Sequence, residues 1–231
     1  MQQFINKQLS FFFLILGFVL LTPSSLIAQN SDLGNWIMGF GQLRFHDNWS
    51  IHAEAQYRNH TVAPNIEQLL LRTGLRLHPN KHTTFLLGYG YVSGHDEDAG
   101  IGNPKSVESR IYQEMTLNHA VSRFSFEHRY RIEQRWVGDD YRNRFRYRLL
   151  ASLALNKPKM GPKTYFLAFY DEVFIAPTST PFDRNRLYGA LGYRWNAKFM
   201  GQIGLLNQAV SDFNKWYLQF AIFATIDTRK D

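Results

Sequence analysis

The chain has 231 residues, of which 45% are hydrophobic, 16% aromatic and 19% charged, and its formal net charge is +7. It contains no cysteine, which excludes a disulfide scaffold, a cysteine-ligated zinc site, an iron–sulfur cluster and a lipid anchor on cysteine. The high aromatic content is typical of a folded chain, and the length fits one domain or at most two.

The first thirty residues have the pattern of an export signal. Lys7 lies in a polar start, residues 9–21 form an apolar run, and TPSSLIA leads to the small residue Ala28. The run is too short to cross a hydrocarbon core of about 30 Å comfortably. We therefore predict a cleaved signal peptide over 1–28, followed by a β-barrel over 29–231.

After residue 30 the chain alternates between apolar and polar residues with period two. Residues 49–58 (WSIHAEAQYR), 124–136 (FSFEHRYRIEQRW) and 142–155 (RNRFRYRLLASLAL) are the clearest runs. Successive side chains of a strand point to opposite sides, so each run has one apolar face and one polar or ionic face. No long stripe with helical spacing is present, which indicates an all-β protein.

The pattern predicts eleven strands, and many of them have 11–15 residues. A tilted strand that crosses a bilayer needs about 9–11 residues, which these lengths satisfy. Bacterial barrels usually have an even number of strands, so we expect twelve, with ten as the alternative. The segments lie near 34–45, 48–58, 66–78, 82–93, 107–119, 122–136, 142–156, 164–175, 184–195, 199–210 and 214–227.

The predicted connections alternate between short and long. Short turns fall at 46–48, 79–81 and 196–198, and longer polar loops at 59–65, 94–106, 137–141 and 176–183. Short turns at one end and longer loops at the other are typical of an outer-membrane barrel. The link at 156–163 is longer than this rule expects.

The apolar faces must contact either lipid or a sealed core. Trp and Tyr recur near the predicted strand ends, where interfacial aromatic belts lie in membrane barrels. We therefore expect a transmembrane antiparallel up-and-down β-barrel, with apolar faces outward and ionic faces toward the lumen. The alternative is a soluble periplasmic ligand-binding barrel, in which the apolar faces are inside.

Several local patterns resemble an uncharacterised family of outer-membrane barrels, domain of unknown function 2490, typical of Bacteroidetes-type bacteria. The resemblance covers about 34–226 and implies an outer-membrane barrel without implying an activity. The chain ends in TRKD and lacks the aromatic C-terminal residue common in such barrels. The matching patterns are EAQYR at 54–58, QLLLRTGL at 68–75, GYGY at 88–91, HRYRIEQRW at 128–136, RFRYRL at 144–149, YDEVF at 170–174 and DRNRLYGALGYR at 183–194.

Ionic residues on the polar faces are the candidate lumen-lining residues. One interpretation is a filled structural barrel, in which Arg–carboxylate pairs occupy the lumen, because an unpaired buried charge costs several kcal/mol. The other is a narrow anion-preferring pore, because a ring of Arg favours anions. The expected partners are outer-membrane lipid and a small anionic solute. The candidates are Glu54, Arg58, Arg72, Arg110, Glu114, Arg129, Arg131, Glu133, Arg144, Arg146, Glu172 and Arg186.

Other functions have weaker signals. A lipid-acting enzyme on the outward face would use His128 or His119 with Ser122, but no Gly-x-Ser-x-Gly nucleophile motif is present. The acidic loop residues at 96–98 lack the ligand spacing of a calcium loop. Basic residues and aromatics lie on separate faces of an exported chain, which disfavours nucleic acid as a partner. We assign no catalytic residue, metal or cofactor, and the oligomeric state is not predicted.

Overall fold

The structure is a computed structural model that describes residues 33–229 except 63–64, 98 and 212. The predicted signal peptide, 1–28, lies outside the described residues. No helix in the described part of the chain has the length and apolarity that a bilayer crossing requires.

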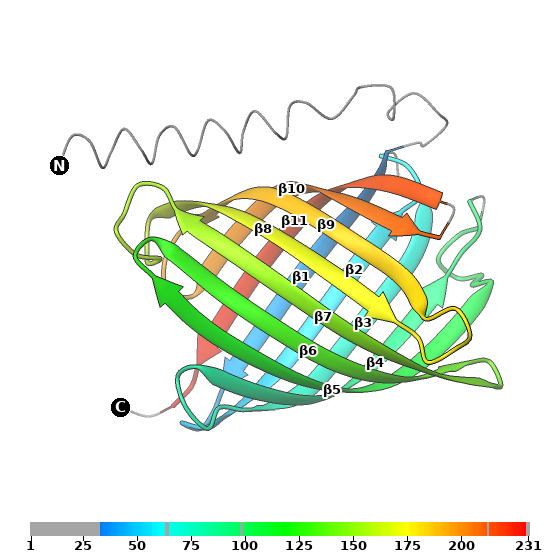
Figure 1. Ribbon diagram of the computed structural model, residues 1–231, viewed down its shortest axis with the longest axis horizontal. Helices are drawn as coiled ribbons and strands as arrows, with labels where there is room; N and C mark the ends of the chain where they lie inside the picture. The colour runs from blue at the N-terminus through cyan, green and yellow to red at the C-terminus, as the bar shows by residue number, and fades with distance from the viewer. Residues whose placement is uncertain (1–32, 63–64, 98, 212, 230–231) are drawn as a thin grey trace. The chain divides into compact units, whose positions relative to one another are not determined.

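The described chain forms one closed β-barrel of eleven long strands (Figure 1). The eleven predicted segments match these strands to within a few residues, because each strand has the period-two alternation that predicts it. The strands are β1 (Gly34–Arg44), β2 (Trp49–Asn59), β3 (Ile66–Leu77), β4 (Thr83–Gly94), β5 (Ser106–Val121), β6 (Phe124–Val137), β7 (Asp140–Ala154), β8 (Thr164–Ile175), β9 (Phe182–Arg194), β10 (Phe199–Val210) and β11 (Phe213–Asp227).

The barrel closes through a parallel pair. Every other neighbouring pair is antiparallel, whereas β1 and β11 run in the same direction, from Gly34 beside Tyr217 to Arg44 beside Asp227. The expectation of twelve strands, with ten as the alternative, is therefore wrong. An even number of strands is required only if the first and last strands pair antiparallel. Here they pair in parallel, so an odd number closes the barrel.

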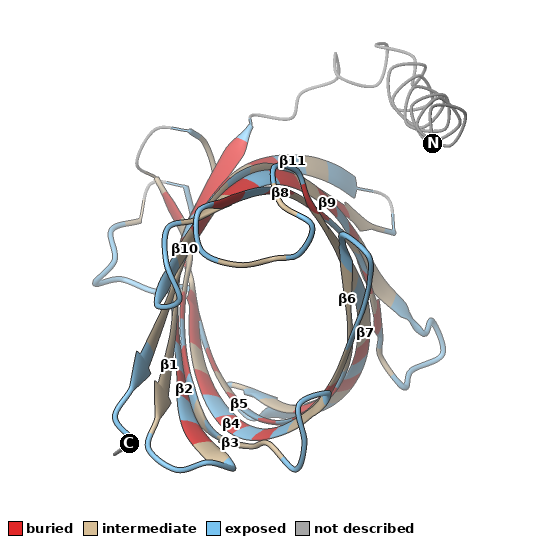
Figure 2. Cartoon of the chain, turned by 90° about the vertical axis from the view of Figure 1, so that its left-hand side faces the viewer, coloured by how far each residue is buried: buried red, intermediate tan, exposed pale blue. Residues whose placement is uncertain are grey.

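Buried and exposed residues alternate along the strands of the wall (Figure 2). In β2, Ser50, His52 and Glu54 are buried, whereas Ile51 and Ala53 between them are exposed. Because the strands curve into a closed ring, one face of every strand points into the lumen and the other points outward. The ionic faces point inward and the apolar faces outward, which is the reverse of a soluble barrel with an apolar interior.

The outward face has aromatic side chains near both rims, and between them it has aliphatic side chains together with a few aromatic ones such as Tyr89, Phe169 and Phe220. Exposed aromatics near the rim with short turns are Phe45, Phe124, Tyr165, Trp195 and Phe199; those near the opposite rim are Trp136, Tyr141, Phe182, Phe213 and Trp216. The exposed aliphatic side chains between the two groups include Leu87, Leu187, Leu191, Ile203 and Ile222.

The two rims differ in their connections, although less regularly than predicted. We call the rim with the turns at 45–48, 78–82 and 195–198 the turn rim, and the rim with the loops at 60–65 and 95–105 the loop rim. The predicted loop at 137–141 is wrong. It is a tight hairpin, in which Gly138 adopts a φ of 57° that suits glycine.

Two glycines face each other where β3 and β4 approach closely inside the barrel. Gly74 pairs with Gly88, and a Cβ on Gly74 would lie 2.5 Å from the carbonyl oxygen of Leu87. The fully buried ring of Tyr112 occupies the space over Gly88. These glycines therefore relieve crowding within the strands.

We predict that Gly74→Ala destabilises the barrel by about 1–3 kcal/mol, because the added methyl group collides with backbone that cannot move aside. Gly39→Ala is the matched control, since nothing lies within 4 Å of a Cβ at that outward position. Urea unfolding of the detergent-solubilised protein, followed by tryptophan fluorescence, measures both. Equal stability of the two variants would contradict the close approach.

Candidate functional site

The twelve predicted ionic residues lie on the inward sides of their strands. Eleven are buried and Arg129 is half-buried. They come from β2, β3 and β5–β9, so the ionic faces of separate strands meet in the lumen.

Glu133 is the centre of the most buried ion network. Its carboxylate has no exposed surface and accepts hydrogen bonds from Arg144 Nε at 3.0 Å and from Arg146 Nη1 at 2.7 Å. Arg131 Nη1 lies 3.6 Å away. One carboxylate thus interacts with guanidinium groups from its own strand, β6, and from β7, which fixes these strands against each other.

Further carboxylates bridge neighbouring strands in the same way. Glu172 accepts hydrogen bonds from Arg129 Nη2 at 2.6 Å and from Arg146 Nη2 at 2.8 Å. Glu114 accepts one from Arg131 Nε at 2.7 Å. The remaining pairs are Glu54 with Arg72, Glu108 with Arg110 and Arg135, Glu127 with Arg148, and Asp183 with Arg144 and Arg184.

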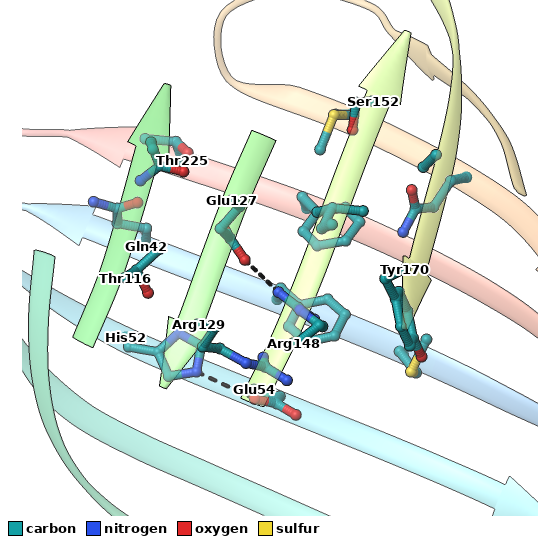
Figure 3. Close-up of a pocket in the computed structure, with 18 of the residues that line it drawn as sticks. Gln42, His52, Glu54, Thr116, Glu127, Arg129, Arg148, Ser152, Tyr170 and Thr225 are labelled. Atoms are coloured by element: carbon teal, nitrogen blue, oxygen red, sulfur yellow. Dashed lines mark hydrogen bonds and ion pairs between the residues drawn. The ribbon is translucent and has the colours of Figure 1, made fainter. Parts of the chain in front are cut away.

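The half of the lumen toward the turn rim contains a cavity of about 550 Å³. Figure 3 shows two contacts among the side chains that line it, Glu127 with Arg148 and His52 with Glu54. Of the twelve predicted residues, Arg110, Glu133 and Arg144 do not line the cavity. The nine that do are Glu54, Arg58, Arg72, Glu114, Arg129, Arg131, Arg146, Glu172 and Arg186.

Side chains fill the half of the lumen toward the loop rim. Trp36 lies at the inner end of the cavity, and the ring of Tyr217 packs on it with centroids 5.0 Å apart. Several inward residues between this level and the loop rim are buried. They include Leu70, Val92, Phe174 and Leu206. The cavity is therefore a blind pocket that opens toward the turn rim.

One wall of the cavity is apolar, a feature that sequence reasoning missed. Phe40 and Phe223 stack there, with ring centroids 4.7 Å apart and an interplanar angle of 8°. The signal was present, because residues 199–211 contain no charged residue. This apolar wall comes from β1 and β8–β11, with contributions from β7 and the link before β8. It comprises Trp36, Met38, Phe40, Leu150, Met160, Phe166, Ala168, Tyr188, Met200 and Phe223.

Four arginines that line the cavity have no carboxylate within salt-bridge distance among the described residues: Arg58, Arg76, Arg186 and Arg194. Arg58 donates instead to the side-chain oxygens of Gln56 and Gln68, at 3.0 and 2.6 Å. The cavity therefore has an excess of positive charge, which favours an anionic occupant.

His78 lies just beyond the end of β3, near the mouth of the cavity. Its Nε2 is 2.8 Å from Ser50 Oγ, and its Nδ1 is 3.1 Å from Thr84 Oγ1. Burial, followed by the positive charges of Arg44 and Arg76, lowers the pKa of His78 below 6.5. His78 is therefore neutral at pH 7 and adds no positive charge to the mouth at that pH.

The residues that the enzyme hypothesis would use, His119, Ser122 and His128, do not line the cavity. His128 Nδ1 is 2.9 Å from the Tyr147 hydroxyl on the outward face, and the His128 ring stacks on that of His119. No serine hydroxyl contacts either histidine within the described chain, and Ser122 forms the hairpin turn after β5. In the described ranges, no group of three or more His, Asp or Glu side chains has the arrangement of a metal site.

We predict that Glu133→Gln destabilises the barrel by about 3–5 kcal/mol, because it leaves buried guanidinium groups without their shared carboxylate. Glu127→Gln removes one partner of the pair with Arg148, which is more exposed than the Glu133 network, and is the control, with an expected loss of about 1 kcal/mol or less. Thermal unfolding measured by circular dichroism compares the two. A loss at Glu133 no larger than that at Glu127 would refute the central role of this carboxylate.

Comparison with known proteins agrees with the sequence resemblance at the level of the family. No curated protein and no solved structure matches the chain significantly. A family model described as a protein of unknown function, DUF2490, matches residues 33–219, which include ten of the strands completely and part of β11. The chain therefore belongs to the DUF2490 family.

Proposed function

We propose that the protein is a β-barrel of the bacterial outer membrane whose lumen holds a small anionic solute in a blind pocket. The observation that carries the membrane assignment is the inverted distribution of side chains. Large apolar side chains cover the outside, whereas the ionic side chains are inside and paired with one another. In water this arrangement would expose the apolar surface at a large cost, and in a bilayer it would not.

The distribution of aromatics supports the same proposal. Trp136 stacks near Tyr141 beside the loop rim, and Tyr193 contacts both Tyr165 and Trp195 beside the turn rim. Amphipathic Trp and Tyr rings near both rims, with a mainly apolar surface between them, suit the two interfaces of a bilayer. Since short turns face the periplasm in bacterial barrels, the cavity would open to the periplasm.

The unpaired cavity arginines support the anionic occupant. Guanidinium groups bind carboxylates and phosphates through planar, charge-assisted hydrogen bonds. Because the half toward the loop rim is filled, a blind binding pocket fits the geometry better than an open passage. A large, steady single-channel conductance in planar bilayers would contradict the blind pocket.

The membrane assignment predicts that Leu87→Arg destabilises the barrel in lipid by about 2–4 kcal/mol, because Leu87 lies on the outward apolar surface near the middle of β4. Ile101→Arg is the matched control, since Ile101 lies in the loop after β4 and is 58% exposed, against 60% for Leu87. Urea titration in lipid vesicles, read from the heat-modifiable migration of the folded barrel on gels, measures both. A water-exposed barrel would tolerate the two substitutions equally.

The anion proposal predicts that substituting two buried arginines changes the stability of the barrel in opposite directions. Arg186→Gln is expected to raise stability by about 1 kcal/mol, because Arg186 has no carboxylate partner in the described chain, as expected for a binding group. Arg146→Gln is expected to lower stability by about 3 kcal/mol, because Arg146 pairs with Glu133 and Glu172. Both are measured by thermal unfolding in detergent.

The same experiment includes inorganic phosphate, compared with chloride at equal ionic strength. Phosphate should stabilise the wild-type protein and Arg146→Gln, and should lose this effect in Arg186→Gln, because a ligand stabilises only the state that binds it. Phosphate stabilisation that survives in Arg186→Gln would remove this arginine from the proposed site.

A further inference from the structure

The cavity has two chemically different walls that lie side by side. The apolar wall belongs to β1 and β8–β11, which are consecutive around the ring, and the ionic wall belongs mainly to β2–β7. A small, fully polar anion would contact the ionic wall and leave the apolar one against water. The geometry therefore suits an occupant that has both an anionic group and an apolar part.

The apolar wall forms a continuous track. Trp36, Met38 and Phe40 are successive inward residues of β1, and Phe223 of β11 continues the wall by stacking on Phe40. At about 3.3 Å per residue, the track from Trp36 to Phe40 is about 13 Å long. Its outer end lies toward the turn rim, where Met200 also lines the cavity.

The inner end of this track meets two of the arginines that lack carboxylate partners. The guanidinium carbon of Arg58 lies 3.8 Å from the centroid of the Trp36 ring, and that of Arg186 lies 4.8 Å from it. Both arginines are buried. Arg186 donates from Nε to Gln208 at 2.8 Å, so its guanidinium is held in place by a neutral group.

We propose that the cavity binds a single-chain anionic amphiphile, with its carboxylate or phosphate between Arg58 and Arg186 and its apolar chain along the Trp36–Phe223 wall. This inference rests on the proposed anion-binding cavity and specifies its ligand. A pocket of about 550 Å³ lies within the range of about 300–1,000 Å³ that small-molecule sites occupy. Burial of the chain would supply the apolar part of the affinity.

The fluorescence of Trp36 reports how the ligand lies in the cavity. The chain has five tryptophans, and the other four lie outside the cavity lining. Replacing Trp49, Trp136, Trp195 and Trp216 by Phe leaves Trp36 as the only tryptophan. The full chain with these substitutions is studied in lipid nanodiscs, and bromine-labelled decanoate serves as the probe because bromine quenches tryptophan fluorescence at short range.

The proposed orientation predicts a difference between two probes. Bromine on the α-carbon, beside the carboxylate, should quench Trp36 more strongly than bromine on the ω-carbon at the far end of the chain. Stronger quenching by the ω-labelled probe would overturn the orientation, and the absence of saturable quenching by either probe would overturn the site.

Competition separates this inference from the anion proposal on which it rests. Unlabelled decanoate should relieve the quenching, whereas acetate and decanol at the same concentration should not. Relief by acetate equal to that by decanoate would keep the anion site and overturn the amphiphile. Relief by decanol equal to that by decanoate would overturn the anion site, and with it the amphiphile.

Substitutions on both walls complete the test. Arg58→Gln and Arg186→Gln should each weaken decanoate binding about tenfold or more, because each removes a charge-assisted hydrogen bond. Met38→Gln, a substitution of similar size on the apolar wall, should weaken it about fivefold. Arg142→Gln and Met115→Gln are the controls outside the cavity, and equal effects in variants and controls would overturn the assignment. Heat-modifiable migration confirms that each variant is folded.

Discussion

The architecture depends on the neutralisation of guanidinium groups inside a closed ring. Glu133 and Glu172 each accept hydrogen bonds from two arginines, and Glu114 accepts from Arg131. The wall from β5 to β8 is therefore cross-linked by charge as well as by backbone hydrogen bonds. Such pairs are stable only when the desolvation of both partners is compensated. The outward face can then be mostly apolar, because the ion-paired side chains have their partners within the barrel.

The ion-paired carboxylates of the described strands do not extend around the whole ring. The cavity in the lumen follows from this. Along the apolar wall, where β1 and β8–β11 present Phe, Met and Ala to the lumen, the described residues form no large salt-bridge network. The arginines at the boundary between the two walls therefore keep neutral partners such as Gln208. A barrel selected only for stability would pair these arginines or replace them. Their retention is consistent with a role in binding that outweighs the stability they cost.

The strands and their faces could be predicted from sequence because alternation is a local property. The pattern in residues 49–58 determines which side chains share a face, whatever strand lies beside them. The seam could not be predicted, because the parallel pairing of β1 with β11 depends on closure of the whole ring. The blind end could not be predicted either, because Trp36 meets Arg58, Arg186 and Tyr217 only through the registers of several strands.

The odd number of strands limits how this chain could be rearranged. The first and last strands run in the same direction, so Gly34 and Asp227 lie at opposite rims. Parallel neighbours can be joined only by a crossover of about a dozen residues or more, and here it would have to pass through the filled lumen or along the apolar exterior. Circular permutation by a short linker, which suits barrels whose ends meet at one rim, is therefore sterically barred in this barrel.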